Sequence, residues 1–193
     1  MPWEKSFDED NALEAAMNVF WAKGYEETSM SDLINAMNIN KGSLYNAYGD
    51  KKTLFLTALK KYDAEQSRAF IKQLHQIDDP VEAINSLFDC MIQQYTDDPE
   101  AKGCLLVNTS LKLIFHDQDV QDIVKEGLKE VELFFETCLK KLKDKNESTN
   151  TLDTKETAKM LTALAVGLRV LSRGTFEVEC LHAIKRQALK IIS

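Results

Sequence analysis

The stretch TSMSDLINAMNINKGSLYNAYGDK, residues 28–51, decides the fold of this chain. Ser29 suits the N-cap of a helix, and Asp32 stands where the second residue of a capping box belongs, with Asp in place of the usual Glu. The helical pattern breaks at Asn38, and asparagine is one of the few non-glycine residues that tolerate a left-handed turn. Asn40 can cap a second helix directly after that turn. The stretch therefore predicts two short helices joined by a tight turn, a helix-turn-helix.

The two short helices have distinct inner and outer faces. We expect Leu33, Ala36, Met37 and Leu44 to face inward and Ile39 to fill the turn. The polar side chains of the second helix then face outward, toward the major groove of DNA. The residues predicted to bind DNA are Ser29, Ser31, Lys41, Gly42, Ser43, Tyr45, Asn46, Tyr48 and Lys51.

Each polar side chain of the second helix has a role suited to its chemistry. An amide such as that of Asn46 can pair with an adenine edge, Lys41 with a guanine edge or a phosphate, and Ser43 with either. Tyr45 and Lys51 are interpreted as phosphate contacts that fix the register of the helix on the duplex. Helix–turn–helix arrangements are common in helical proteins, so this pattern alone does not establish DNA binding.

The charge distribution is compatible with DNA, although the formal net charge is −7. Residues 38–62 hold five lysines, at positions 41, 51, 52, 60 and 61, against the single acid Asp50. Residues 1–37 hold two lysines against eight acids. DNA affinity needs a local basic surface rather than a basic protein, so we expect moderate, salt-sensitive binding.

The rest of the chain also has helical periodicity. With 3 Pro and 7 Gly in 193 residues, helix-breaking residues are scarce, and no alternating strand pattern of useful length occurs. We predict an all-α fold of about nine helices, with a three-helix N-terminal helix-turn-helix domain and a larger C-terminal helical domain for ligand binding and dimerisation. The predicted domains are residues 1–60 and 61–193, with the boundary inside a long fourth helix.

Residues 8 to about 60 resemble the N-terminal domain of TetR-family transcriptional regulators. Three positions depart from the family pattern: Asn38 replaces its usual Gly, Ala47 its usual His and Tyr48 its usual Phe. The base preference of the family is therefore not transferred to this chain. The matching elements are Ala15-Ala16, Phe20, Gly24-Tyr25, Thr28-Ser29, Leu33, Ile39, Lys41-Gly42, Leu44-Tyr45, Tyr48-Gly49 and Lys51.

The resemblance implies that the remaining helices form a ligand pocket, and the segment 101–113 (AKGCLLVNTSLKL) is similar to one that borders the pocket in a subset of such regulators. Apolar and Met side chains at helical spacing are more often simple core, and that alternative stays open for each residue. The residues predicted to line the pocket are Met91, Tyr95, Cys104, Leu105, Asn108, Phe115, Phe134, Cys138, Met160, Leu164 and Leu168.

Cys104 and Asn108 each have two interpretations. Cys104 follows Gly103 at a predicted helix N-terminus, which stabilises a thiolate and favours a redox or electrophile sensor, or it is a small buried apolar residue. Asn108 places an amide in an apolar helix, where it needs a partner, either a ligand or a neighbouring backbone group.

The last two predicted helices, residues 154–172 and 176–192, have apolar faces wider than a single layer buries, which favours a dimer surface. In the family such helices from two subunits form a four-helix bundle. A two-fold dimer places two recognition helices one or more DNA turns apart, so the expected partner is a near-palindromic double-stranded operator.

The function predicted is a TetR-type repressor that a small-molecule or redox effector releases from its operator. An enzyme is not expected, because the sequence has no Gly-rich phosphate loop, no HExxH and only the scattered His75, His116 and His182. An interaction protein that has lost DNA binding is the alternative, favoured slightly by Ala47 and the acidic first helix. We expect no cofactor, metal or membrane contact, and a cytoplasmic location, because neither a signal peptide nor a transmembrane segment is apparent.

Overall fold

The computed structural model describes residues 7–98, 100–145, 153–174 and 176–192 of the chain. Every regular element in these ranges is helical, which confirms the predicted all-α fold. The elements are α1 (Glu9–Lys23), α2 (Met30–Met37), α3 (Lys41–Tyr48), α4 (Lys51–Tyr62), η1 (Asp63–Arg68), α5 (Ala69–Leu74), α6 (Pro80–Asp97), α7 (Leu105–Ser110), η2 (Leu113–Phe115), α8 (Gln118–Lys145), α9 (Thr154–Leu171) and α10 (Val178–Lys190). Because α4, η1 and α5 follow one another without a break, the described ranges contain nine helices and the short 3-10 turn η2.

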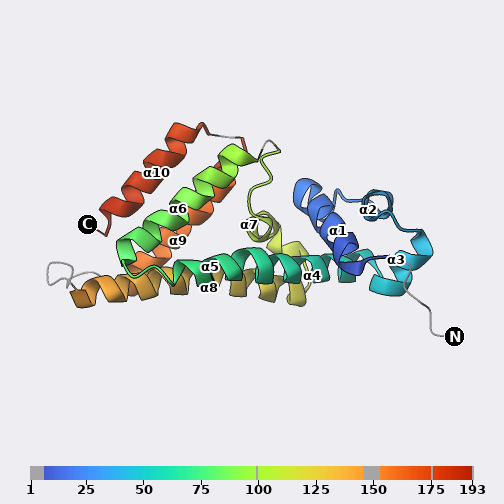
Figure 1. The fold of residues 1–193 in the computed structure, drawn as a ribbon, viewed down its shortest axis with the longest axis horizontal. Coiled ribbons are helices and arrows are strands. Elements are labelled where there is room, and N and C mark those ends of the chain that lie inside the picture. The colour runs from blue at the N-terminus through green and yellow to red at the C-terminus, as the bar shows by residue number, and fades with distance from the viewer. Residues whose placement is uncertain (1–6, 99, 146–152, 175, 193) are drawn as a thin grey trace.

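The helices α1 to α4 form a small unit at one end of the molecule (Figure 1). The side chain of Asp8 caps α1 by accepting a hydrogen bond from the backbone N–H of Asn11 at 3.1 Å. Gly24 ends the helix with φ of 85°, a conformation that glycine adopts without strain. Phe20 from α1 and Phe55 from α4 meet edge to face in the core of the unit, with their ring centroids 5.0 Å apart. Complete burial of each ring contributes about 1.5–3 kcal/mol to the stability of this unit.

The core of the N-terminal unit extends into α7 and the first turns of α8. Leu105, Leu106, Val120 and Val124 lie in the same buried cluster as the apolar residues of α1 to α4. The small unit is therefore not packed separately from the rest of the chain. A displacement of α7 or α8 changes the surface on which α1 and α4 rest.

One long helical connection joins the small unit to the larger body. It runs from α4 through η1 to α5 beside the long helix α8 (Figure 1). The middle part, η1, is π-helical, and such segments are frequent at functional sites. The predicted domain boundary at residues 60 and 61 falls just before η1, and it stays a prediction.

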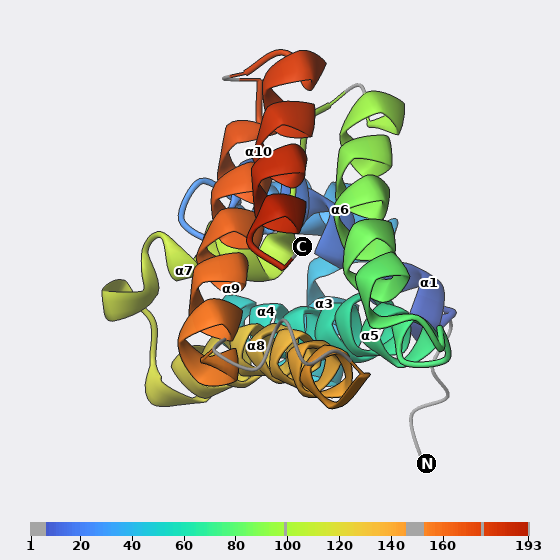
Figure 2. The same ribbon diagram turned by 90° about the vertical axis from the view of Figure 1, so that its left-hand side faces the viewer.

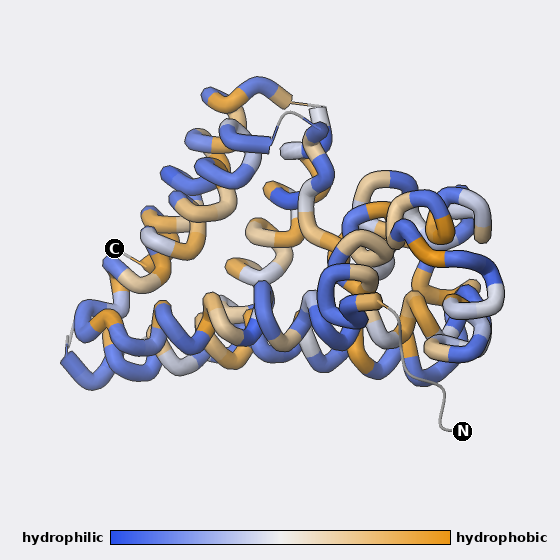
Figure 3. Tube along the Cα trace, turned by 45° about the vertical axis from the view of Figure 1, so that its right-hand side comes forward, coloured by the Kyte–Doolittle hydropathy of each residue, from blue (hydrophilic) through white to orange (hydrophobic). Residues whose placement is uncertain are grey.

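The larger body is built from α5, α6, α8, α9 and α10, with α10 between α9 and α6 (Figure 2). Its core includes the fully buried Phe88, Phe134, Phe135, Leu161 and Leu168. Hydrophobic and hydrophilic residues alternate along the helices, as amphipathic helices require (Figure 3). Among the described residues, no helix combines the length with the apolar composition that a membrane span needs.

The packing of α2 differs from the prediction at one position. Leu33 and Met37 are buried as predicted, but Ala36 is exposed. Residues three and four apart share a helix face, and the buried face of α2 is centred between Leu33 and Met37, with the half-buried Ile34 beside them. Ala36 therefore lies outside the contact between α2 and its neighbours.

Candidate nucleic-acid interface and adjoining cavity

The start of α2 is fixed by a reciprocal pair of side-chain to backbone hydrogen bonds. Ser29 Oγ accepts from the backbone N–H of Asp32 at 3.1 Å, and Asp32 Oδ2 accepts from the backbone N–H of Ser29 at 2.9 Å. Lys23 Nζ donates to Asp32 Oδ1 at 2.6 Å and, with the Ser29 bonds, holds the pKa of Asp32 well below its usual range. The predicted capping box is confirmed, and a cap of this kind stabilises a helix by about 1 kcal/mol.

The turn between α2 and α3 has the predicted geometry. Asn38 is left-handed, with φ of 51° and ψ of 43°. Asn40 Oδ1 accepts from the backbone N–H of Ser43 at 2.8 Å and so caps α3. The two predicted roles, a left-handed turn residue and an N-cap, are confirmed. These local bonds fix where α3 begins and therefore which of its side chains face outward.

The outer face of α3 is polar and open. Lys41, Gly42, Tyr45 and Asn46 are exposed, as is Ser31 near the start of α2. Lys41 Nζ lies 5.8 Å from the centroid of the Tyr45 ring, a cation–π arrangement that gathers the two side chains on one patch. A cation, a phenol and an amide thus point away from the body on an eight-residue helix. A short exposed helix with these groups has the form of a recognition helix.

Two of the residues predicted to bind DNA face the protein instead. Ser43 is only 6% exposed, because it lies next to the buried Leu44 on the inner side of α3, so the predicted base contact of its side chain is corrected. Tyr48 is half-buried, and its hydroxyl donates to the backbone carbonyl of Glu9 at 3.2 Å. Burial, with Glu9 and Asp10 nearby, raises the pKa of the Tyr48 phenol. Tyr48 therefore ties α3 to α1.

The basic surface is narrower than the count of lysines suggests. Lys52 pairs with Asp117 at 2.6 Å, and Lys61 pairs with Glu65 at 2.9 Å. Lys51 Nζ lies 4.4 Å from the centroid of the Tyr25 ring and donates to the backbone carbonyl of Glu26 at 3.4 Å. No carboxylate of the described residues forms an ion pair with Lys51, while these two contacts hold its ammonium group in place.

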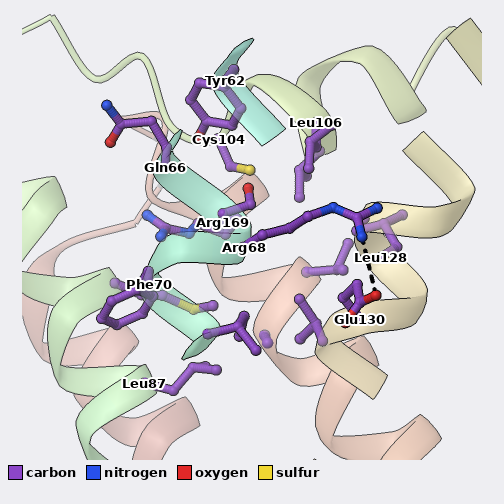
Figure 4. Close-up of a pocket in the computed structure, with 18 of the residues that line it drawn as sticks. Tyr62, Gln66, Arg68, Phe70, Leu87, Cys104, Leu106, Leu128, Glu130 and Arg169 are labelled. Carbon is purple, nitrogen blue, oxygen red and sulfur yellow. Dashed lines mark hydrogen bonds and ion pairs between the residues drawn. The ribbon is translucent and has the colours of Figure 1, made fainter. Parts of the chain in front are cut away.

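A cavity lies where α4, η1 and α5 face α7, α8 and α9 (Figure 4). Its interior leaves about 90 Å³ of accessible space, and the gaps between its side chains together with the open mouth amount to about 850 Å³. Tyr62 and Cys104 meet in its wall, and burial together with the Cys104 thiol raises the pKa of Tyr62 well above its usual value. Trp21 Nε1 donates to the backbone carbonyl of Gly103 at 3.1 Å, which holds the segment before α7 against α1.

One wall of the cavity carries a network of charges around Arg68. Its Nε donates to Asp63 Oδ2 at 2.7 Å, and its Nη1 to Glu130 Oε1 at 3.2 Å. Arg68 Nη2 lies 3.5 Å from Glu126 Oε2. Arg68, a wall residue of the cavity, therefore links the π-helical segment η1 to α8.

Two family models match this sequence. Residues 12–58 match the N-terminal model described as bacterial regulatory proteins, tetR family. Residues 80–188, more than half of the chain, match the model described as tetracyclin repressor-like, C-terminal domain. The chain belongs to the TetR family. It is a TetR-family DNA-binding transcriptional regulator and, like the family as a whole, not an enzyme.

Individual relatives agree with this placement of the TetR-family chain. It is 30% identical over 179 residues, 92% of each chain, to the uncharacterized HTH-type transcriptional regulator YezE of Bacillus subtilis. It is 27% identical to the HTH-type transcriptional repressor ComR of Escherichia coli, over 97% of this chain and 90% of ComR. Among solved structures, a cysteine mutant of the TetR-family regulator CifR, complexed with 26-base-pair operator DNA, superposes with a TM-score of 0.83 at 29% identity. That superposition covers 97% of this chain and 98% of CifR.

The structure of the TetR-family chain places five of the predicted pocket residues in three separate cavities and the other six outside them. Met91 and Cys104 line the cavity of Figure 4. Leu105 and Asn108 line a neighbouring cavity beside Tyr25, and Tyr95 lines a third near Lys102. The remaining predicted residues lie elsewhere: Phe134, Cys138 and Leu168 in the apolar core, Leu164 partly buried against that core, and Phe115 and Met160 on the surface with 76% and 45% exposure.

The pocket predictions for these six residues were wrong because they relied on helix periodicity alone. It separates apolar from polar faces, but it does not separate core from cavity wall. Asn108 satisfies its amide locally, because Nδ2 donates to the backbone carbonyl of Lys102 at 2.7 Å, while Oδ1 is buried with no partner among the described residues. The side-chain NH₂ group of Asn108 therefore has a backbone partner, as one of the two interpretations expected.

The sequence reasoning missed the polar groups of the cavity. Tyr62, Gln66, Arg68, Glu130 and Arg169 all line it. One signal was available for Arg169, which is the only charged residue in LTALAVGLRVL, residues 161–171. A charge in such an apolar segment demands a partner or a polar cavity.

Proposed function

We propose that this regulator is a homodimeric repressor that binds a near-palindromic operator through α3 and leaves it when a small molecule enters the cavity of Figure 4. The observation that carries the proposal is the outward patch of Lys41, Tyr45 and Asn46 on a helix whose start is fixed by side-chain caps. The relatives support it, since CifR is complexed with operator DNA and ComR is named a repressor. The site of action would be the cytoplasm, where bacterial DNA lies.

The exposed residues of α3 divide the work of recognition. Asn46 reads an adenine edge, which discriminates against the wrong base by about 1–3 kcal/mol. Lys41 contacts a guanine edge or a phosphate, while Tyr45 and Lys51 contact phosphates and fix the register. Ser29, Ser31 and Gly42 lie at the start of α2 and α3, where backbone and hydroxyl groups reach the phosphates.

The dimer interface that we propose lies on α9 and α10. Met160, Ala163, Gly167 and Val170 follow one another at helical spacing along α9, and Met160 is 45% exposed. Phe176, which precedes α10, adds a further apolar side chain with 40% exposure. Two such helices from each subunit form a four-helix bundle, and the two-fold axis of that bundle gives the operator its near-palindromic sequence.

Release from DNA follows from where the cavity lies. Its wall includes Tyr62 and Leu106, which also belong to the core of the N-terminal unit. An effector that binds one arrangement of these residues more tightly shifts the population toward it. A preference of about 3 kcal/mol changes operator occupancy by about a hundredfold.

Cys104 offers a second input, an oxidant or electrophile. It is half-buried, lines the cavity and occupies the N-cap position of α7. By contrast, burial raises the pKa of Cys138 to about 11, which leaves that thiol unreactive. Alkylation by iodoacetamide at neutral pH tests the idea, because labelling of Cys104 no faster than that of a free thiol would remove the sensor.

A gel-shift experiment with the DNA upstream of the protein's own gene tests the whole proposal. We expect sequence-specific, salt-dependent retardation, weakened uniformly by Lys51→Ala, which removes a phosphate contact, with a salt slope lower by about one. Asn46→Ala should instead relax specificity at one base pair, and Lys72→Ala, on the exposed side of α5, should leave binding unchanged. A folded dimer that retards no DNA would favour the interaction-protein alternative.

A further inference from the structure

The cavity of Figure 4 is apolar apart from a few polar side chains. Its apolar lining includes Phe70, Ile71, Leu87, Met91, Val131 and Ala165. These six residues come from α5, α6, α8 and α9, whereas Trp21, Tyr62 and Leu106 extend the apolar lining toward the N-terminal unit. A ligand that fills it needs an apolar portion of its own.

Two arginines line this cavity in different electrostatic states. Arg68 is satisfied by Asp63, Glu126 and Glu130. Arg169 is half-buried, and within the described ranges no carboxylate forms an ion pair with its guanidinium. The dashed line of Figure 4 joins Arg68 to Glu130, and none reaches Arg169.

The charge of Arg169 acts on the interior of the cavity. It partly offsets the rise in the pKa of Tyr62 that burial causes, and it does the same for the half-buried Cys90. A half-buried guanidinium without a counter-charge costs free energy, and a bound anion recovers that cost. Gln66 lines the same cavity and offers a further hydrogen-bonding group.

We propose that Arg169 anchors the carboxylate of a small amphipathic organic acid, whose apolar portion lies along Met91 and Val131. A planar guanidinium binds a carboxylate through two parallel hydrogen bonds. The carboxylate of Glu130 in the same cavity repels a second negative charge, so a monoanion fits better than a dianion. This inference rests on the proposed function, because it takes the cavity to be the effector site.

Calorimetric titration of the full-length protein with octanoate tests the inference, with octan-1-ol and octyl phosphate as matched compounds. Octanoate should bind at least about tenfold more tightly than octan-1-ol, the size of one charge-assisted hydrogen bond. Octyl phosphate, a dianion, should bind more weakly than octanoate. Equal affinity for octanoate and octan-1-ol, or no binding of octanoate, would overturn the proposal.

Variants of Arg169 separate charge recognition from a structural role. Arg169→Gln should weaken octanoate at least about tenfold and leave octan-1-ol unchanged. The matched control is Arg173→Gln, since Arg173 is exposed and outside this cavity, and it should bind octanoate like the wild type. If Arg169→Gln loses both compounds, Arg169→Lys decides: retained octanoate binding supports the anchor, and its loss overturns it.

A labelling measurement locates the ligand. Octanoate should slow the alkylation of Cys104 by iodoacetamide in the wild type and not in Arg169→Gln, since Cys104 lines the same cavity. Unchanged labelling despite binding would place octanoate elsewhere and overturn the inference. The gel shift keeps the two proposals apart: DNA binding without octanoate binding overturns only this inference, and octanoate binding without DNA binding overturns only the repressor.

Discussion

Arg68 Nε donates a 2.7 Å hydrogen bond to Asp63 Oδ2 between the two ends of the π-helical segment η1. In an α-helix, residues five apart point about 140° away from each other, whereas the wider turn of the π-helix brings them closer to the same face. The same guanidinium reaches Glu130 on α8. The π-helical segment η1 therefore places the Arg68 guanidinium where it joins the connecting helix to α8.

The first prediction concerns an asymmetry in this pair. The side chain of Asp63 is 9% exposed and that of Arg68 is 40% exposed. Arg68→Met leaves a buried carboxylate without its cation and should lower the free energy of unfolding by about 1–3 kcal/mol. Asp63→Ala should cost less, because Arg68 keeps two carboxylates on α8. Urea unfolding at equal protein concentration measures both, and an equal or reversed order would contradict this account.

The second prediction concerns Gly127 on α8. A Cβ atom at this position would lie 2.7 Å from Leu106 Cδ1 and 3.0 Å from Asp63 Oδ1. Gly127→Ala should therefore destabilise the protein by about 1–3 kcal/mol, although alanine is the better helix former by about 1 kcal/mol.

A double-mutant cycle isolates the cause at Gly127. In a Leu106→Ala background the methyl group that obstructs residue 127 is absent, so Gly127→Ala should cost at least about 0.5 kcal/mol less than in the wild type. Strictly additive unfolding free energies would show that the contact with Leu106 is not the reason.

The third prediction concerns pH and His116. This residue follows η2, and its ring stacks on Phe55 with centroids 5.6 Å apart and meets Tyr25 edge on at 5.5 Å. Burial lowers the pKa of His116 below its usual 6.5, and Lys112 adds to this, while Glu26 and Asp117 oppose it. The folded protein thus favours the neutral ring.

The sign of the pH effect follows from linkage. As the pH falls below 6.5, the unfolded chain takes up the proton first, so stability present above that pH is lost as the pH falls through the folded pKa. Between about pH 7.5 and pH 5, the urea midpoint of the wild type should fall further than that of His116→Phe, while carboxylates affect both alike. Parallel curves for the two proteins would refute a role for His116.

The fourth prediction concerns the proposed dimer. Nothing lies within 4 Å of a Cβ placed at Gly167, so the single subunit tolerates a side chain there. A buried charge in the proposed four-helix bundle does not fit, so Gly167→Glu should shift the sedimenting mass from twice 21.9 kDa toward 21.9 kDa without unfolding the chain. Gln73→Glu, on the exposed side of α5, is the matched control. A dimer that persists in Gly167→Glu would place the interface elsewhere.

The helix-turn-helix could be predicted from the sequence because its determinants are local. The bonds from Ser29 to Asp32 and from Asn40 to Ser43 span three residues each, and the left-handed Asn38 acts at one position. Such interactions depend on residue type and spacing, and both are visible in the sequence. The inward side chain of Ser43 escaped prediction because it depends on how α3 rotates against the rest of the core.

The sequence by itself determined the helical class and the caps of α2 and α3, since each follows from neighbours within a turn or two. Only the tertiary structure decided the cavity, because Tyr62, Arg68, Cys104 and Arg169 come from segments far apart in the chain. Their meeting depends on the angles at which long helices cross and on the π-helical irregularity of η1. Apolar periodicity indicates which face of a helix points to the interior. It contains no information on whether that face packs against another side chain or borders a cavity.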